Sequence, residues 1–584
     1  MHCEQFLRFA HRLAHVANTD RLQKPESIQT VLSNQLNAKN VLKRPIAVKI
    51  LLLLSAFLIL AIAYYYNFCR FPRTSDDANI FLAGSEISDG NWRLKGWWLP
   101  EDNFLTIDLP LYALVVKCLG FTPYIMFYLP AALWAGVALL SLVLSGSGLT
   151  GRKKMVALAA VTTPVLLPII GNHSGMETIA HVWPHTGTIL YVLLIFLLAK
   201  MAMSGQRGHS TSILMAYTFI VVSAAFGDSF AIYIGILPVV TVAAFSIFCG
   251  SKSRQNLLVL VLTLFAGLLG KILVEVNSIT GGFHLIHLPV KFVEFDELGK
   301  NVVSVIQYFF KLFGCDFFGR EVFAFSIDGA ALSLIRLPFL ALLVAAFIAF
   351  YKKLLGSIRV VRKKWPVLED DYLDAFLAVA FTINVLAAVF SDRITDAGSI
   401  RFMVPALVFG AIFIARAQIK MQWVGTYFYF ALLVSMGFSL TSYARNPRSS
   451  VLVSREIEAV SQWLSNNELC YGFGPYWSSS IVTAATNSLV EIRAVVADSE
   501  GKLKPFEWNG NREWYHSGAT GAGRAVFVLA HEEEKIYYSE ADVLRTLGEP
   551  LQKHEVGPYI INLYDAGNER LKSLFLPASE QGFY

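Results

Sequence analysis

Long apolar runs alternate with short polar stretches along most of this chain. As helices rising about 1.5 Å per residue, such runs can cross the roughly 30 Å hydrocarbon core of a membrane. The pattern therefore predicts a polytopic α-helical membrane protein with about eleven transmembrane helices. The predicted helices lie near residues 46–66, 122–145, 155–171, 186–203, 211–226, 230–249, 256–276, 332–351, 373–391, 403–416 and 423–442.

The pattern changes after residue 442. The segment "SREIEAVSQWLSNN" has helical spacing, whereas "LCYGFGPYW", "RAVFVLAH" and "YIINLYD" have the composition of strands, and clusters of Gly, Asn and Ser separate them. This alternation predicts a soluble α/β-type domain over residues 443–584. It follows a transmembrane module over 46–442 and a segment over 1–45 that is polar, mixed in charge and unlike a cleavable signal, so the first span should be retained.

Two long polar connections, 67–110 and 277–331, interrupt the transmembrane module. The second is too long for a simple link and contains "NVVSVIQYFFKLFG", an amphipathic stretch that suits a lid or a lipid-guiding helix at the membrane interface. The first begins with two adjacent carboxylates and contains Trp97 and Trp98, a residue type that is enriched at membrane interfaces.

Basic residues are unevenly distributed between the loops. Fourteen Lys and Arg fall in compact alternate loops, and the opposite loops carry about ten in more than twice that length. By the positive-inside rule the compact loops and the N-terminus are cytoplasmic, and both long connections and the C-terminal domain lie outside. Few cysteines and no organelle signal favour a bacterial inner membrane with a periplasmic domain over the endoplasmic reticulum.

Composition narrows the possible partners. The chain is 55% hydrophobic and 16% charged with a net charge of +6, which excludes a soluble multidomain protein and makes membrane lipid the main partner. No basic block is interleaved with aromatic residues, so a nucleic-acid partner is not expected. Six cysteines without CxxC spacing argue against a zinc site or a disulfide scaffold.

Asp76 and Asp77 follow the first predicted span directly. One interpretation is that a carboxylate caps the helix beginning "ANIFLAG", since Asp is a preferred N-cap residue. The other is that the pair carries chemistry, because a carboxylate beside a reacting hydroxyl can act as a general base and adjacent carboxylates can hold Mg²⁺ or Mn²⁺.

The order of motifs after the first span resembles that of membrane glycosyltransferases of the GT-C superfamily, in the branch of protein O-mannosyltransferases and lipid A aminoarabinose transferases. The matching pieces are Asp76-Asp77, Gly90-Asn91-Trp92, Asp108-Leu109-Pro110-Leu111-Tyr112 and, on a late span, Arg401-Phe402-Met403-Val404-Pro405. Two positions differ from that branch. The second carboxylate is Asp instead of Glu, and Asp108 replaces a lysine that contacts donor phosphate, so the donor contacts are expected to differ.

This resemblance implies transfer of a sugar, with inversion, from a polyprenyl-phosphate donor to a lipid, glycan or protein acceptor outside the membrane. Asp76 is our candidate for the general base, with Asp77 assisting. The favoured interpretation requires no cofactor, and the alternative places Mg²⁺ or Mn²⁺ on this pair.

Arg401 and Arg393 are the candidates for gripping the donor phosphate, since a guanidinium binds phosphate oxygens in a bidentate manner. They can instead be interface anchors or partners of nearby carboxylates. The candidate substrate contacts are Asp108, Tyr112, Asp228 and a cluster formed by His173, Glu177 and His181, to which His185 adds. The alternative for Asp228 is a helix cap, and for the His/Glu cluster a metal site or plain polar contacts.

Tryptophans in the C-terminal domain suggest a surface that stacks on sugars, against the alternative of core packing. They are Trp477, Trp508 and Trp514.

Two other functions compete with a glycosyltransferase: a lipid-glycan transporter or flippase, and a non-catalytic assembly factor for cell-envelope glycans. Transporters typically show related halves and interrupted midplane helices, and we find neither pattern in the sequence.

Overall fold

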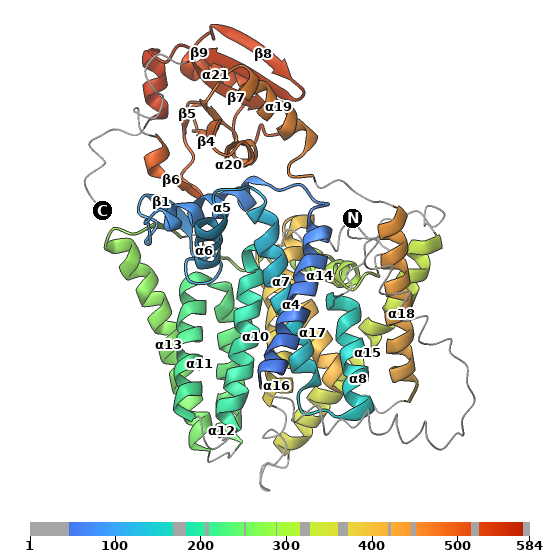
Figure 1. The fold of residues 1–584 in the computed structure, drawn as a ribbon. Helices are drawn as coiled ribbons and strands as arrows, with labels where there is room; N and C mark the ends of the chain where they lie inside the picture. Colours follow the sequence, from blue (N-terminus) through green and yellow to red (C-terminus); the bar gives the residue numbers. More distant parts are fainter. Residues whose placement is uncertain are drawn as a thin grey trace. The chain divides into compact units, whose positions relative to one another are not determined.

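The computed structural model describes residues 46–166, 183–204, 210–249, 253–287, 289–315, 327–359, 372–417, 422–445, 451–515 and 525–575. By their contacts the residues divide into two units, Met1–Ala56 and Phe57–Tyr584. Most of the described residues are helical, and the larger sheet lies in the C-terminal part (Figure 1).

Seven helical segments among the described residues are long and apolar enough to cross a membrane. The helices that carry them are α4 (Ile46–Phe68), α7 (Ile125–Gly146), α10 (Trp183–Met203), α13 (Arg254–Ile279), α15 (Ile327–Arg359), α16 (Tyr372–Phe390) and α17 (Val404–Ala417), the last continuing the 3-10 helix η3 (Ala397–Met403). The protein is therefore membrane-associated.

Further helices occupy the other apolar stretches, so each predicted span has described residues in a helix, although a total of eleven spans stays a prediction. These helices are α6 (Leu109–Leu119), α8 (Gly151–Val161) with η1 (Thr162–Leu166), α11 (Ser210–Gly227), η2 (Ile232–Ile236) with α12 (Leu237–Phe248), and α18 (Gln422–Arg445).

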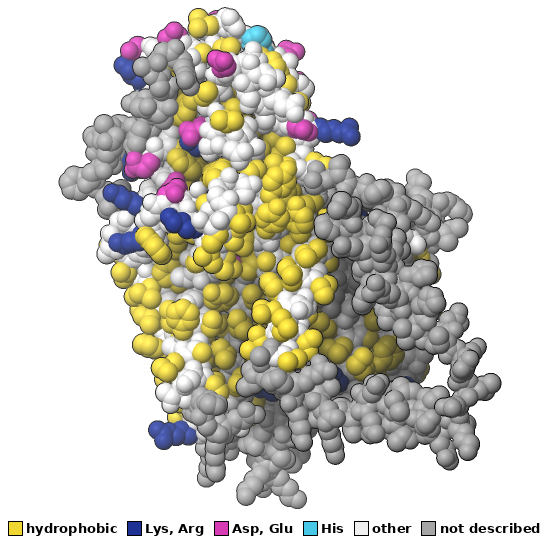
Figure 2. All heavy atoms as spheres, in the orientation of Figure 1, with side chains coloured by type: hydrophobic (Ala, Val, Ile, Leu, Met, Phe, Trp, Pro, Cys, Tyr) yellow, Lys and Arg dark blue, Asp and Glu magenta, His cyan; other side chains and the backbone are white. Residues whose placement is uncertain are grey.

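Helix α13 illustrates how the bundle meets its surroundings. Leu264, Phe265 and Leu268 are more than half exposed, as expected for side chains in contact with lipid, and hydrophobic side chains cover the helices in Figure 2. On the buried side, a Cβ at Gly270 would lie 2.7 Å from the Ala225 Cβ of α11. This small residue allows the close helix contact that is common in membrane proteins.

The segment before α6 inserts between the ends of α10 and α11. The Phe104 amide donates to the Gly227 carbonyl over 2.7 Å, and Ile107 is buried. A Cβ at Gly187 would lie 1.8 Å from Asp108 Oδ1, and one at Gly227 would lie 2.7 Å from Ile107 Cγ1. Two glycines on separate helices thus provide the space that this connection fills.

The C-terminal domain, residues 451–515 and 525–575, has a six-stranded mixed sheet with its helices α19 (Arg455–Asn466), α20 (Tyr476–Ala485) and α21 (Glu540–Leu547). The strand order is β5 (Leu503–Pro505), β4 (Glu491–Ala497), β3 (Tyr471–Gly474), β7 (Val526–His531), β9 (Tyr559–Tyr564) and β8 (Gln552–Val556). The central strand β3 is parallel to both neighbours, and the other pairings are antiparallel. The helix and the three strands predicted from the sequence are confirmed as α19, β3, β7 and β9, except that Tyr476 and Trp477, predicted within the first strand, begin α20.

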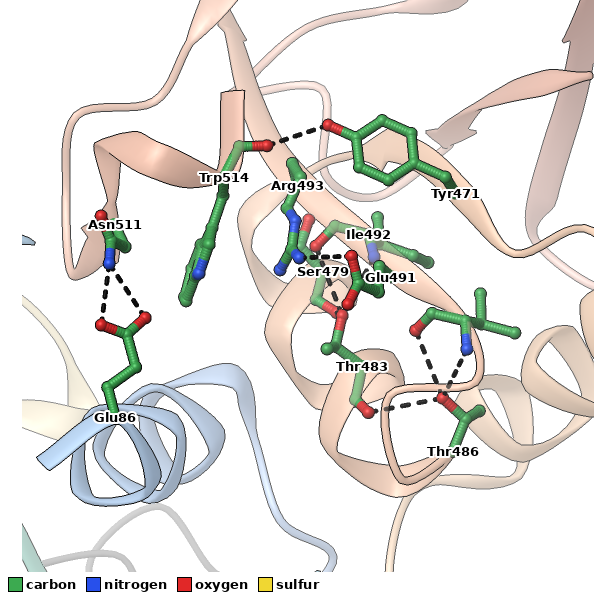
Figure 3. A network of polar contacts seen from close by, with 11 residues as sticks. Glu86, Tyr471, Ser479, Thr483, Thr486, Glu491, Ile492, Arg493, Asn511 and Trp514 are labelled. Carbon is green, nitrogen blue, oxygen red and sulfur yellow. Dashed lines mark hydrogen bonds and ion pairs between the residues drawn. The ribbon is translucent and has the colours of Figure 1, made fainter. Parts of the chain in front are cut away.

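A second sheet joins segments that are far apart in the sequence. Its strands are β1 (Trp97–Pro100), β2 (His284–Ile286) and β6 (Gly510–Asn511), with β1 in the middle. Next to it, the Asn511 amide donates to both carboxylate oxygens of Glu86, at 2.9 and 2.8 Å (Figure 3). Glu86 belongs to α5 (Ser75–Ser88). Both long connections and the C-terminal domain are therefore held together.

The amphipathic stretch in the second connection forms α14 (Leu298–Leu312), as predicted. Asn301 donates to the carbonyls of Val389 and Ser391, and the Tyr308 hydroxyl donates to the Asp396 carbonyl over 2.5 Å. These hydrogen bonds attach α14 to the end of α16 and to the residue that precedes η3. Its position at a membrane interface stays a prediction.

Candidate functional site

The two adjacent carboxylates lie in the first turn of α5 and have different partners. Asp77 is buried, and its Oδ2 accepts from the backbone N and the hydroxyl of Thr74, at 2.8 and 3.0 Å, in a capping box. Its Oδ1 accepts from Arg73 Nη1 at 3.3 Å. Asp77 is thus the third helical residue of a capping box whose N-cap is Thr74, so the prediction of an Asp N-cap for a helix beginning "ANIFLAG" is wrong, and both oxygens of Asp77 are engaged.

Asp76 contacts the C-terminal domain instead. The Tyr476 hydroxyl, at the start of α20, donates to Asp76 Oδ1 over 2.5 Å. The same hydroxyl accepts from the Asn79 amide at 3.1 Å, and only 4% of Tyr476 is exposed. One oxygen of Asp76 is thus fixed by a residue 400 positions away, and the other has no such partner among the residues that the structure describes.

The surroundings of Asp76 alter its titration. Burial raises the pKa of this carboxyl, and the charges of Asp77 and Asp102 add to the effect. The hydrogen bond from Tyr476 and the positive charge of Arg401 act in the opposite direction, without reversing the rise in pKa. A carboxyl with a raised pKa that also interacts with a nearby cation is typical of functional sites, although ion-pair networks can also produce it.

Arg401 lies in η3, which a capping box between Asp396 and Ser399 stabilises. The guanidinium is 5.1 Å from the centre of the Phe402 ring, and its charge favours ionisation of both Asp76 and Asp102. Within the described residues the structure gives Arg401 no hydrogen bond or ion pair. It is therefore a cation available to an anionic ligand close to Asp76.

Arg393, the other predicted phosphate contact, has different surroundings. Its Nη2 donates to the Pro289 carbonyl at 3.2 Å, and its Nε lies 3.7 Å from Asp392 Oδ1. These contacts connect it to the second long connection, as the alternative of a nearby carboxylate partner anticipated. None of these contacts of Arg393 involves Asp76.

A buried pair, His185 and Asp228, lies next to this region. His185 Nδ1 is 2.8 Å from Asp228 Oδ2, which also accepts from the Thr188 hydroxyl at 2.5 Å, while Asp228 Oδ1 accepts from the Phe230 amide at 2.8 Å. The centre of the Phe402 ring is 6.0 Å from that of His185. Asp228 therefore caps the following turn and orients His185 beside the residue that follows Arg401.

Asp102 connects the two groups electrostatically. Burial raises its pKa, the charge of Asp228 adds to this rise, and the charges of His185 and Arg401 oppose it. Asp102 was not among the candidate site residues, and His185 was only an addition to the predicted cluster of His173, Glu177 and His181. The signal for Asp102 was an acidic "PEDNF" ahead of a proline-led apolar helix, and His185 was one of several histidines in "NHSGMETIAHVWPH".

Asp108 and Tyr112 lie in the interior behind this site, and each is at most 1% exposed. Neither carboxyl oxygen of Asp108 has a hydrogen-bond partner among the described residues. Burial raises its pKa well above the usual range, and the charge of Asp228 adds to the effect, so the neutral acid is favoured. The lysine expected from the resemblance is thus replaced by a group whose environment opposes charge.

The predicted cluster of His173, Glu177 and His181 lies outside the described residues. In the part of the chain that the structure describes, no group of three or more His, Cys, Asp or Glu is arranged to hold a metal ion. A Mg²⁺ or Mn²⁺ held jointly by Asp76 and Asp77 stays a prediction.

Comparison with models of known protein families gave no match, and comparison with curated proteins gave none either. The assignment of function therefore depends on the residues themselves. The structure brings together Asp76, Arg401, Asp102 and the His185–Asp228 pair, and adds Tyr476 from the C-terminal domain.

Proposed function

We propose that this protein is a membrane glycosyltransferase that transfers a sugar from a polyprenyl-phosphate donor to an acceptor hydroxyl. The observation that carries the proposal is the arrangement at Asp76: one oxygen is fixed by Tyr476, the pKa is raised, and Arg401 supplies a cation nearby. The proposed setting is a bundle of about eleven spans in a bacterial inner membrane, with the N-terminus in the cytoplasm and the C-terminal domain in the periplasm.

In the proposed reaction, the acceptor oxygen attacks the anomeric carbon while its proton passes to Asp76. The new carbon–oxygen bond forms as the bond from the anomeric carbon to the phosphate oxygen breaks, and that electron pair leaves with the polyprenyl phosphate. Arg401 stabilises the charge on the departing phosphate through charge-assisted hydrogen bonds. Attack opposite the leaving group inverts the anomeric centre.

The position of the polar groups favours this proposal over its rivals. A transporter needs a binding site near the membrane midplane, reachable from both sides. Here the interacting groups are contributed by the start of α5, the connection before α6, the start of α10, η3 and the C-terminal domain. A non-catalytic assembly factor would not require a half-buried carboxylate with a raised pKa.

A direct test is release of polyprenyl phosphate by the full-length protein in lipid nanodiscs. We expect time-dependent release from a donor with a radiolabelled sugar, together with transfer of the label to extracted membrane lipids or glycans. Mass analysis of lipids and surface glycans from cells with and without the gene identifies the product. Identical profiles, combined with no release from any polyprenyl-phosphate sugar, would reject a glycosyltransferase.

Arg401→Ala should weaken use of the donor by about 10- to 100-fold in kcat/KM, because a charge-assisted hydrogen bond contributes roughly 1.5–3 kcal/mol. Arg393→Ala is the matched control, since the contacts of Arg393 are with Pro289 and Asp392. Donor titrations at a fixed acceptor concentration measure kcat/KM for both variants. Equal losses in the two variants would contradict the role of Arg401.

Tyr476→Phe should move the acid limb of the pH–rate profile to higher pH. Asp76 acts as a base only when ionised, and the lost hydrogen bond is one of the two interactions that lower its pKa. The loss of rate is therefore greatest in acid. It shrinks as the pH rises above the pKa of Asp76 in both the unmodified protein and the variant. Tyr471→Phe, which removes a hydroxyl that donates to the Trp514 carbonyl, should leave the limb in place.

A further inference from the structure

Three aromatic side chains of the C-terminal domain form one group with Tyr476. The ring centres of Trp477, Phe506 and Tyr537 lie 5.0, 5.6 and 6.1 Å from that of Tyr476, and those of Phe506 and Tyr537 are 5.6 Å apart. We call these residues, Tyr476, Trp477, Phe506 and Tyr537, the aromatic cluster. Because the Tyr476 hydroxyl contacts Asp76, this cluster adjoins the proposed base.

The cluster is only partly covered. Trp477 is 42% exposed, and Phe506 and Tyr537 are half-buried, although large aromatic side chains usually bury most of their surface. Burial and the charges of Glu534 and Asp76 raise the pKa of Tyr537 to about 12, which places this ring within the electrostatic reach of Asp76. Ring surface is thus accessible next to the candidate base.

Polar groups border the rings. Glu534 accepts from the Ser478 hydroxyl at 2.5 Å and from the Trp477 amide at 3.2 Å. Asn509, whose backbone lies in the left-handed region with φ of 44°, opposes the rise in the pKa of the Tyr476 hydroxyl. A carboxylate and an amide thus lie beside the aromatic rings.

The other tryptophans proposed for sugar stacking differ in their surroundings. The ring of Trp514 lies 5.1 Å from that of Trp97, and the guanidinium of Arg493 lies 4.7 Å from the Trp514 ring, as Figure 3 shows for Arg493 and Trp514. Trp514 therefore serves the packing between the C-terminal domain and the first connection. Of the aromatic residues selected from the sequence, Trp477 is the one that the structure places in the cluster beside Asp76.

We propose that the aromatic cluster is the acceptor site of the glycosyltransferase and that the acceptor is a carbohydrate. A pyranose has an apolar face of C–H groups that packs on an aromatic ring, and hydroxyls at its edge that require hydrogen-bond partners. The rings and the flanking Glu534 and Asn509 match both requirements. This inference rests on the proposed function, and it names the hydroxyl that reacts: a sugar hydroxyl directed at the second oxygen of Asp76.

Two other acceptor classes fit less well. A lipid acceptor without sugar needs an apolar path from the membrane, whereas the cluster belongs to the C-terminal domain. A peptide would present a single Ser or Thr hydroxyl, which has no need of several rings in mutual contact. The contacts between Tyr476 and Asp76 place the cluster where a ring stacked on Trp477 or Phe506 can extend toward the base.

The experiment measures binding independently of transfer. Saturation-transfer difference NMR on the full-length protein in nanodiscs uses the methyl glycosides of glucose, galactose, mannose and N-acetylglucosamine, and a Ser/Thr-containing peptide. We expect saturation transfer to at least one sugar and not to the peptide. Trp477→Ala should weaken sugar binding by about tenfold, the size of a typical hot-spot truncation.

Trp463→Ala is the matched control, because Trp463 is a half-buried tryptophan of the same domain whose ring lies 4.9 Å from that of His554. The Trp463→Ala protein should bind the sugars as tightly as the unmodified protein does. Binding of none of the sugars, equal binding by Trp477→Ala, or binding of the peptide alone would overturn the carbohydrate proposal. The proposed function fails separately, if no polyprenyl phosphate is released although sugars bind.

Discussion

Replacing Asp76 by Asn is expected to lower the rate of sugar transfer by about 10²–10⁴-fold, the usual contribution of a general base. The amide has nearly the same shape as the carboxylate and can still accept a hydrogen bond from Tyr476, so the junction with the C-terminal domain should persist. The amide cannot take up the acceptor proton at neutral pH. The measurement is the initial rate of labelled product formation at saturating donor.

Two controls separate this effect from misfolding. Asp89→Asn changes an exposed carboxylate at the end of the same helix and should leave transfer unchanged. The Asp76→Asn protein should keep the thermal midpoint of the unmodified protein in the same detergent. If Asp76→Asn retains more than half of the transfer rate, another group must be the base.

Replacing Arg73 by Met is expected to destabilise the fold by about 3–5 kcal/mol, because it leaves the buried carboxylate of Asp77 without its partner. Arg73 is 3% exposed, and its Nη2 donates to the carbonyls of Phe68 and Phe71, both at 3.2 Å. Its guanidinium also lies 4.6 Å from the centre of the Phe127 ring. The single substitution thus removes contacts to α4, α5 and α7 together.

A double-mutant cycle tests whether the pair acts as a unit. Arg73→Met and Asp77→Asn should each lower the thermal midpoint strongly, and the double variant should lose less than the sum of the two. Lys300→Ala is the comparison for an exposed pair, since Lys300 and Glu297 are 66% and 51% exposed, and it should leave the midpoint unchanged. Additive losses would show that Arg73 and Asp77 stabilise the fold independently.

The different fates of Asp76 and Asp77 show where sequence reasoning reaches its limit. The sequence predicted an Asp N-cap or a chemical role for the pair; the N-cap is instead Thr74, which Asp77 supports from the third helical position, and a chemical role for Asp76 stays a prediction. Adjacent residues on a helix differ by about 100° in direction, so neighbours in sequence face different surroundings. Which one faces Arg73 and which faces Tyr476 depends on how α5 packs against α20.

The same limit applies to the arginines and histidines. Arg393 and Arg401 were equivalent by position in the chain, yet Arg393 contacts Pro289 while the charge of Arg401 acts on Asp76. His185 was one histidine of several until its contact with Asp228 distinguished it. These distinctions are made by residues 40 to 400 positions away, which no local pattern contains.

The sequence by itself determined the apolar helices, the amphipathic helix α14, and helix α19 with strands β3, β7 and β9 of the C-terminal domain. Those features follow from local causes: the length and apolarity of a segment, the alternation of a strand, and the residues that end each one. Only the tertiary structure decided that the C-terminal domain supplies Tyr476 to Asp76, that the Asn103–Asp108 segment inserts between α10 and α11, and that Asp108 is buried with no hydrogen-bond partner among the described residues. The physical reason is that hydrogen bonds, charge interactions and burial depend on distance in space, and the packing that sets those distances joins parts of the chain that the sequence keeps apart.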